Sequence, residues 1–496
     1  MDPLVTLVLF ASFVILLAVG APIYLSLGLS ALIVIAVFDL VPLAAVPSQI
    51  QGSLSSFTLL AVPFFIFAGN LLAGSELTAR LIDLSRAVVG RVRGGLAIVT
   101  TITGVFFAGI SGSGPADTAA LGATLLPALD RDRYDKGFSA ALVAASGAIG
   151  IIVPPSIALI IYGVVANASI GRLFLAGVLP GVLVAVSLAV VSVIQSRRKG
   201  YGPLEPAHET LASADPIGSK ALAPPHAGSA HPEAGQERRT EAGKVTGTED
   251  RVAVHVETGP VDERTLAAPP RPGRARLIAH TFRRAVWGLL APLIILGGIY
   301  GGIFTPTEAA AVVVLYALFV GVFVYRDMRI KSFISVLAES TRTTGVVMII
   351  VACASLFAFL LNTQGIARAA ATGLADAIPN AVLTLLLINV ILLVAGAFLD
   401  AISVFYILTP ILLPTAVAFG VDPIHFGIIM CVNLAIGQIT PPVGVNLYVA
   451  AAVGRIPVAR VIGSLGPILL AELVALGIIT FVPGLSLWLP DVLGVL

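Results

Sequence analysis

Long apolar runs constrain the fold of this chain more than any other feature of its sequence. They are about 17–25 residues long, the length an α-helix needs to cross a hydrocarbon core of ~30 Å. Only 11% of the residues are charged, whereas soluble domains carry roughly a quarter. A soluble protein cannot bury so many such runs, so the sequence predicts an all-α polytopic membrane protein. The predicted spanning segments are residues 4–20, 24–42, 57–74, 137–163, 170–196, 285–303, 306–325, 343–361, 424–450 and 461–483.

Two further apolar stretches, residues 95–129 and 381–418, do not fit simple spanning helices. Each is too long for one helix and too short for two full crossings with a loop between them. Each also carries small or polar residues near its middle: SGSGP at 111–115 in the first, and Asp400 with Ser403 in the second. We therefore predict two re-entrant hairpins whose tips are buried in protein and not in lipid.

The distribution of Lys and Arg predicts the orientation of the helices. The cationic clusters fall on one side of a self-consistent path, which we assign to the cytoplasm, and both termini then lie outside. Residues 199–284 are rich in Pro, Gly, Ala and charge and poor in aromatic residues, so they cannot build a core and are predicted to form a disordered cytoplasmic loop. A simple linker between two halves is the plainer reading of this loop, and a regulatory or partner-binding role is the alternative.

An internal repeat is the most informative feature of the sequence. At a fixed offset of 287 residues, LLP at 125–127 matches LLP at 412–414, and IGIIVPP at 149–155 matches IGQITPP at 436–442. The charge pattern places the first hairpin entry in the cytoplasm and the second outside, so the two halves have opposite topology. Inverted repeats with interrupted helices are the signature of secondary transporters whose site lies at the midplane.

These observations predict five regions along the chain. They are N-terminal scaffold helices at 1–56, a first inverted repeat at 57–198, the loop at 199–284, scaffold helices at 285–342, and a second inverted repeat at 343–496.

Each half carries a Pro-Pro pair in the middle of a predicted helix. Proline removes an amide donor and clashes with the preceding turn, so two in a row after a glycine should break the helix. The carbonyl groups released in this way need partners in an apolar medium, and a cation such as Na⁺ is a suitable one. The half-helix that follows directs its amide groups at the same place, which favours an anion. A proline kink without a ligand is the alternative.

Polar side chains at the hairpin tips add candidate ligands. A carboxylate at membrane depth is costly and is by default functional, which singles out Asp117 and Asp400. Helix capping is the alternative role for each of them. Further polar groups lie on the broken helices, where a helix–helix hydrogen bond is the alternative for each: Ser146, Asn433, Gln438, Thr440 and Asn446.

The chain resembles the large membrane subunit of the TRAP transporters, the M-type permease of tripartite ATP-independent periplasmic systems. The resemblance covers nearly the whole chain except the loop. It rests on PFFIFAGNL at 63–71, GISGS at 109–113 with AD at 116–117, IG at 149–150 with PPS at 154–156, GGIFTPTEAA at 301–310, FLD at 398–400 with LTP at 408–410, NL at 433–434 and TPPVG at 440–444.

The resemblance implies sodium-driven import of organic acids, such as C4-dicarboxylates, across the bacterial inner membrane. A periplasmic binding protein would deliver the substrate, a separate small four-helix membrane subunit would pack beside this one, and an elevator motion would carry the site across the lipid bilayer. Two or more Na⁺ ions are expected, and nothing indicates a nucleic-acid partner. This sequence departs from the family pattern at Gly114-Pro115 and at Ile151, which leaves the first site less well defined than the second.

Carried over residue by residue, the resemblance places one sodium site between the first hairpin tip and the first helix break, and another between the second tip and the second break. The predicted sodium ligands are Ser111, Gly112, Ser146, Gly147, Gly150 and Val153 in the first repeat and Gly396, Asp400, Gly437 and Thr440 in the second. The predicted substrate-binding residues are Ser111, Ser113, Asp117, Thr118, Ser156, Ser403 and Asn446.

Two other functions compete with this reading. A self-sufficient sodium/carboxylate carrier would share the hairpins and broken helices but need no binding protein. An intramembrane protease would use Ser111 or Ser113 as a nucleophile, yet such chemistry needs a base within hydrogen-bond reach. His425 is the only histidine beside the proposed core, and it is predicted at the opposite edge. We therefore expect a transporter and not an enzyme.

Overall fold

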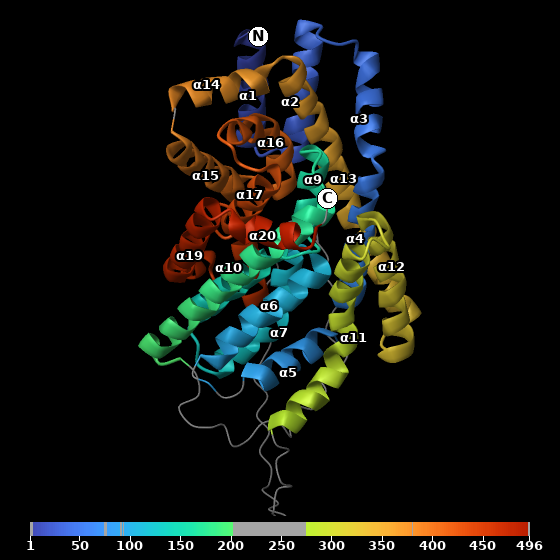
Figure 1. Cartoon of the computed structure of the whole chain (residues 1–496), viewed down its shortest axis with the longest axis vertical. Coiled ribbons are helices and arrows are strands. Elements are labelled where there is room, and N and C mark those ends of the chain that lie inside the picture. Colours follow the sequence, from blue (N-terminus) through green and yellow to red (C-terminus); the bar gives the residue numbers. More distant parts are fainter. Residues whose placement is uncertain are drawn as a thin grey trace, which may run out of the picture. The chain divides into compact units, whose positions relative to one another are not determined.

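The computed structural model describes residues 3–73, 77–89, 92, 94–201, 274–378 and 380–494, and every regular element in these ranges is helical (Figure 1). The predicted all-α class is therefore confirmed. The α-helices are α1 (Pro3–Ala18), α2 (Ile23–Phe38), α3 (Val46–Leu54), α4 (Ala61–Ala73), α5 (Leu77–Val89), α6 (Gly95–Ser111), α7 (Gly114–Arg131), α8 (Lys136–Ala148), α9 (Ile157–Val165), α10 (Ile170–Lys199), α11 (Arg274–Tyr300), α12 (Pro306–Phe319), α13 (Ile330–Thr363), α14 (Ile366–Ala377), α15 (Ala381–Phe398), α16 (Ala401–Ala418), α17 (Pro423–Gly437), α18 (Val445–Gly454), α19 (Val458–Phe481) and α20 (Gly484–Val492).

Several of these helices are long and apolar enough to cross a membrane. Seven in the described ranges meet both criteria, or eight if the bent pair of Leu43–Leu54 and Phe57–Ala73 counts as one span. A helix satisfies its own backbone hydrogen bonds, which makes it one of the few structures that an apolar medium accepts. The chain is a multi-pass membrane protein, as predicted.

Both predicted hairpins are present as helix pairs with very short connections. The helices α6 and α7 are joined by Gly112 and Ser113, and α15 and α16 by Leu399 and Asp400. Gly112 adopts a positive φ of 62°, a conformation that glycine reaches without a steric penalty. The helices α15 and α16 are each 18 residues long and pass the length criterion for a span, so their length alone does not decide between two crossings and a re-entrant hairpin. The re-entrant character of both pairs stays a prediction.

Both predicted broken helices are also present. The chain leaves α8 through a short 3-10 turn at Ile149–Ile151 and starts α9 only after Ser156, and it leaves α17 at Gly437 and starts α18 after Gly444. Each Pro-Pro pair lies inside its break. Both first halves start from equivalent aspartate caps, since the Asp135 carboxylate accepts from Phe138 N at 2.9 Å and the Asp422 carboxylate from Ile424 N at 2.7 Å.

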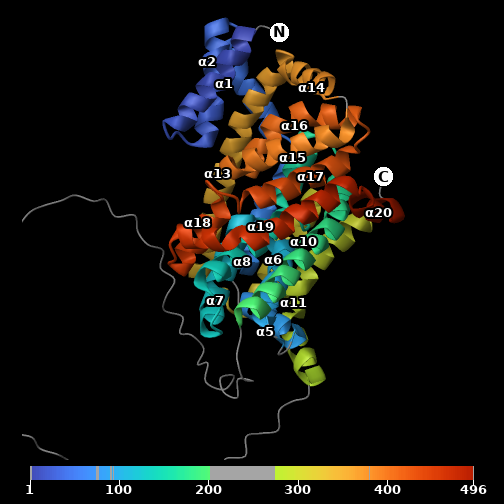
Figure 2. The same cartoon turned by 90° about the vertical axis from the view of Figure 1, so that its left-hand side faces the viewer.

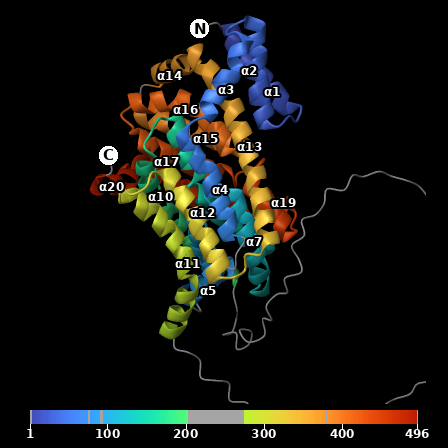
Figure 3. The ribbon, with the colours of Figure 1, turned by 90° about the vertical axis from the view of Figure 1, so that its right-hand side faces the viewer.

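Helices of the two repeats pack against each other. The helix α18 of the second repeat lies beside α7 and α8 of the first, and α19 lies along α8 (Figure 2). The helices α12 and α13 pack against α4 (Figure 3). These contacts bring helices on both sides of the two breaks together.

Two of the predicted region boundaries do not coincide with the ends of helices. The first eleven residues of α11 fall in the predicted loop 199–284, because the apolar pattern that defined the span from residue 285 begins later than the helix itself. The boundary at residue 342 falls inside α13, a single helix of 34 residues. Its first turns are polar enough to resemble a connection, although the backbone continues unbroken. Residues 202–273 of the predicted loop lie outside the described residues.

Candidate functional site between the hairpin connections and the helix breaks

The connection between α6 and α7 lies directly on the break between α8 and α9. A Cβ added to Gly112 would lie 2.6 Å from the carbonyl oxygen of Pro155, and one added to Gly150 would lie 2.3 Å from Oδ2 of Asp117. Backbones approach this closely only where a side chain is missing on one of them. The two glycines thus allow the tip and the break to meet, as the sequence predicted.

Asp117 is the most unusual group in this region. Its side chain is 1% exposed, and Ser111 donates a hydrogen bond to Oδ1. The other oxygen, Oδ2, is buried and has no hydrogen-bond partner in the described part of the chain. Burying an isolated carboxylate is very unfavourable unless a proton or a cation compensates it. The substrate-binding role predicted for Asp117 stays a prediction, and the unpartnered Oδ2 atom would also suit a cation ligand.

Further side-chain oxygen atoms lie on α8 and in the first turns of α7. Ser146 is fully buried and its hydroxyl also has no partner among the described residues. A Cβ on Gly147 would lie 2.1 Å from Oγ1 of Thr118, and this hydroxyl donates to the carbonyl of Gly114 at 2.8 Å. The predicted ligands Ser111, Gly112, Ser146, Gly147 and Gly150 therefore lie at one place. Hydroxyl, carbonyl and carboxylate oxygens are the ligands that hard cations take, so these residues fit a sodium ion.

Two predicted residues of the first break also make structural contacts through their side chains. The hydroxyl of Ser156 donates to the Ile151 carbonyl and accepts from Leu159 N at 3.4 Å, so it caps the start of α9. The side chain of Val153 packs on Gly181 of α10. Ser113 precedes α7, but its side chain makes no cap bond.

The second connection is built differently around Asp400. Both oxygens of its carboxylate are satisfied by Ser403, with the backbone N donating at 3.0 Å and the hydroxyl at 2.6 Å. Asp400 and Ser403 thus form the N-terminal cap of α16, the alternative that the sequence left open. The predicted glycines do meet nearby, since a Cβ on Gly437 would lie 2.5 Å from the carbonyl carbon of Gly396. The Thr440 hydroxyl donates back to Ile436 O at 2.7 Å.

Side chains of the second break reach the first hairpin. A Cβ on Gly114 would lie 2.3 Å from Oε1 of Gln438 and 3.1 Å from Nδ2 of Asn446. Asn446 is fully buried and also donates to the Ala144 carbonyl at 3.3 Å. The oxygens Gln438 Oε1 and Asn446 Oδ1 have no partner among the described residues. These amides therefore lie beside the N-terminal end of α7, a helix of 18 residues.

Three buried polar residues of the second repeat were not singled out from the sequence: Asn389, Glu472 and Thr480. Asn389 of α15 accepts from Asn433 Nδ2 at 2.7 Å and donates to Thr480 Oγ1 of α19 at 3.1 Å, which ties the hairpin to both neighbouring helices. Glu472 of α19 is 2% exposed, and its Oε2 has no partner in the described chain. A carboxylate inside an apolar run was a readable signal for Glu472, whereas the Asn389 contacts depend on the packing.

Within the described ranges, His425 does not contact the serines of the first tip. The Ser111 hydroxyl contacts Asp117, and the Nε2 atom of His425 lies 3.3 Å from the carbonyl oxygen of Thr480. The histidine considered as the base of a serine protease is therefore not paired with Ser111.

Comparisons with known proteins agree with this architecture. The family described as "Tripartite ATP-independent periplasmic transporter, DctM component" matches residues 10–485. The chain is 37% identical, over 98% of its length, to the isethionate TRAP transporter permease protein DctMQ of Oleidesulfovibrio alaskensis, of which it spans 66%. It is also 37% identical, over 95% of its length, to the C4-dicarboxylate TRAP transporter large permease protein DctM of Pseudomonas aeruginosa, of which it spans 94%.

A solved structure shares the fold. The crystal structure of the Alcanivorax borkumensis YdaH transporter matches with a TM-score of 0.55 and 13% sequence identity, over 90% of this chain and 88% of that one. Similarity at this level of identity concerns the fold alone.

Proposed function

The chain belongs to the DctM component family of the tripartite ATP-independent periplasmic (TRAP) transporters as a large permease subunit, and from this premise we propose that it imports a small organic acid together with sodium ions. The family places such a subunit in the bacterial inner membrane. The observation that carries the sodium proposal is the buried, unpartnered Oδ2 of Asp117 at the break of the α8–α9 helix.

The charge balance of the region supports coupling between a cation and an anion. A sodium ion beside Asp117 would compensate the carboxylate and the carbonyl groups of the break. The N-terminal end of α7 and the amide groups of Gln438 and Asn446 would then hold the carboxylate of a substrate. Because no Lys or Arg takes part in this arrangement, the cation offsets part of the substrate charge, and each ion favours binding of the other.

The substrate class is proposed as small organic anions, with C4-dicarboxylates first. The two relatives named above are equally similar to this chain, yet one is named for isethionate and the other for C4-dicarboxylates. Overall similarity therefore does not separate these substrates. We propose that a periplasmic binding protein selects the substrate and delivers it, and that a small membrane subunit assists this chain.

Uptake into proteoliposomes tests the proposal. The full chain, its small subunit and its binding protein are reconstituted, and uptake of radiolabelled succinate and isethionate is followed with an inward gradient of Na⁺ or of K⁺. We expect uptake of at least one of them only with Na⁺ and only with the binding protein present. Equal uptake in K⁺ would contradict sodium coupling, and sodium-driven uptake without the binding protein would favour the self-sufficient carrier.

A further inference from the structure

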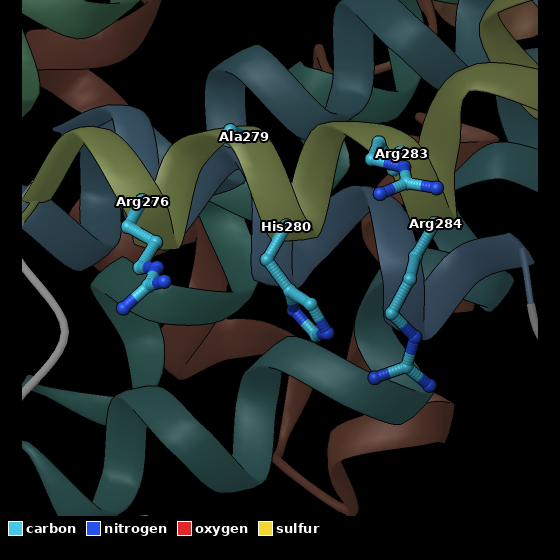
Figure 4. A pocket seen from close by; sticks show the side chains of 5 residues that line it. All are labelled: Arg276, Ala279, His280, Arg283 and Arg284. Atoms are coloured by element: carbon cyan, nitrogen blue, oxygen red, sulfur yellow. The ribbon is translucent and has the colours of Figure 1, made fainter.

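The N-terminal part of α11 carries a cluster of cationic side chains on one face. Arg276, His280, Arg283 and Arg284 line the same open hollow together with Ala279. Residues three, four and seven or eight apart share a face of a helix, and the side chains of Arg276, His280 and Arg284 extend to the same side of α11 (Figure 4). We call this set the α11 basic face.

The length of α11 indicates how deep this face lies in a membrane. The helix has 27 residues and ends at Tyr300, whereas about 20 residues suffice to cross the hydrocarbon core. Counting back from Tyr300 leaves Arg276 and His280 beyond the core, while Arg283 and Arg284 lie within one turn of its edge. Long arginine side chains near a helix end reach back to the headgroups. The α11 basic face therefore lies at the level of lipid headgroups.

An aromatic residue continues the same face toward the apolar part of the helix. Trp287 follows Arg283 by four residues and is 36% exposed. Tryptophan is enriched at the boundary between headgroups and hydrocarbon. Cations followed one turn later by an indole match the order of chemical groups that a phospholipid presents, with the phosphate outermost and the glycerol and acyl chains below it.

The described part of the chain provides little negative charge to balance this face. Asp83 of the adjacent helix α5 interacts electrostatically with Arg284, but also with Arg86. The ion pairs found among the described residues involve none of the three arginines of α11. Within these ranges, one shared carboxylate therefore faces three arginines and one histidine, and the described surface carries a net positive charge.

We propose that the α11 basic face is a binding site for the headgroup of an anionic phospholipid such as phosphatidylglycerol. A general excess of cations on the cytoplasmic side explains the number of charges, but it does not require them to share one face. Cations close to an anionic leaflet each add to binding, and four cationic or titratable side chains of this face line one hollow. This proposal does not depend on the sodium site, which lies in other helices.

The last turn of α10 provides a matched control. Arg197 and Arg198 are also exposed cations at a helix end, and the charge pattern assigns them to the same side of the membrane. They are consecutive, and consecutive residues of a helix do not face each other. The double variants Arg276→Gln/Arg284→Gln and Arg197→Gln/Arg198→Gln therefore remove the same charge, but only the first disrupts a shared face.

Lipid retention by the full chain tests the site. The wild type and both double variants are purified in the same detergent, incubated with equal amounts of phosphatidylglycerol and phosphatidylcholine, and examined by native mass spectrometry. We expect the wild type to retain phosphatidylglycerol preferentially, the α11 variant to retain about tenfold less of it, and the α10 variant to behave like the wild type. Equal losses in both variants would show that diffuse surface charge causes the effect, which would contradict a site on α11. Full retention of phosphatidylglycerol by the α11 variant would contradict the site as well.

Thermal unfolding supplies a second readout that separates lipid from free phosphate. Added phosphatidylglycerol should raise the unfolding temperature of the wild type and of the α10 variant, but not of the α11 variant, because a ligand of the folded state stabilises it. Inorganic phosphate at millimolar concentration should have no such effect. An equal rise with inorganic phosphate alone would contradict a lipid site. Since all the substituted side chains are exposed, the variants should unfold like the wild type without lipid.

Discussion

Ser113 and Asp400 occupy equivalent places in the two helix pairs, 287 residues apart, and yet only one of them caps its helix. Each directly precedes the second helix of its pair. Asp400 accepts hydrogen bonds from the backbone and the hydroxyl of Ser403, whereas Ser113 makes no cap bond. In the first repeat the carboxylate stands four residues later, at Asp117, and one of its oxygens has no partner. The two connections are equally short, but they differ in the hydrogen bonds of their polar side chains.

This difference predicts that Asp400 tolerates the loss of its charge. Asparagine and aspartate are about equally good N-caps, so Asp400→Asn should keep the sodium concentration for half-maximal uptake within about twofold, while Asp400→Ala should lower the free energy of unfolding by ~1 kcal/mol. Sodium titration of uptake and denaturation in detergent measure the two effects. A large rise in the sodium requirement of Asp400→Asn would show that Asp400 binds the cation through its charge.

Asp117 should respond in the opposite way. Asp117→Asn removes the unpartnered buried charge, so we expect the sodium concentration for half-maximal uptake to rise by at least about tenfold, with no loss of thermal stability, because an isolated buried charge is itself unfavourable. Asp130→Asn on the same helix is the matched control, since Asp130 pairs with Lys136 on the surface at 3.3 Å. The idea fails if Asp117→Asn keeps the sodium dependence of the wild type.

The sequence predicted the helical elements of the site more accurately than its ligands. The Pro-Pro pairs locate both breaks because proline cannot continue the hydrogen bonds of a helix, and the small or polar residues in the middle of two apolar stretches located both helix pairs. The role of Asp400 was left open, because a capping carboxylate and a cation ligand look the same in sequence. The side chain of Gln438 lies beside Gly114, more than three hundred residues away in the chain, and no local pattern shows such a contact. The extended start of α11 and the continuity of α13 were missed because hydropathy identifies the apolar part of a helix and not its polar turns.

Close contacts at the tips and breaks predict that replacing either of two glycines lowers stability and transport. Gly437→Ala would place a methyl group 2.5 Å from the Gly396 backbone, and Gly150→Ala would place one 2.3 Å from the Asp117 carboxylate. Overpacking of this kind costs roughly 1–3 kcal/mol, so both variants should unfold at lower temperature and transport poorly. Gly477→Ala in α19 is the control, because nothing lies within 4 Å of its added Cβ. It should match or slightly exceed the wild type in stability. Wild-type transport by Gly437→Ala would show that the second tip and break need not touch.

A contact between the two repeats predicts how stability depends on pH. Arg460 of α19 donates to the carboxylate of Asp135 at 2.9 Å, and Ser464 donates to it at 3.3 Å. Partial burial raises the pKa of Asp135, but the backbone N–H of Phe138 and the Arg460 guanidinium outweigh it and hold the pKa below its ordinary value of 3.8. Because the folded state has the lower pKa, this stabilisation is complete above the unfolded pKa and is lost as the pH falls through the folded one.

Arg460→Gln should therefore unfold at a lower temperature than the wild type at neutral pH, and the two curves should converge as the pH falls below about 4. Thermal unfolding in detergent across this pH range measures the difference. Arg455→Gln at the nearby helix end is the control, since no ion pair among the described residues includes Arg455. A gap between wild type and Arg460→Gln that stays constant down to the lowest pH would show that Arg460 stabilises the fold through packing and not through the carboxylate of Asp135.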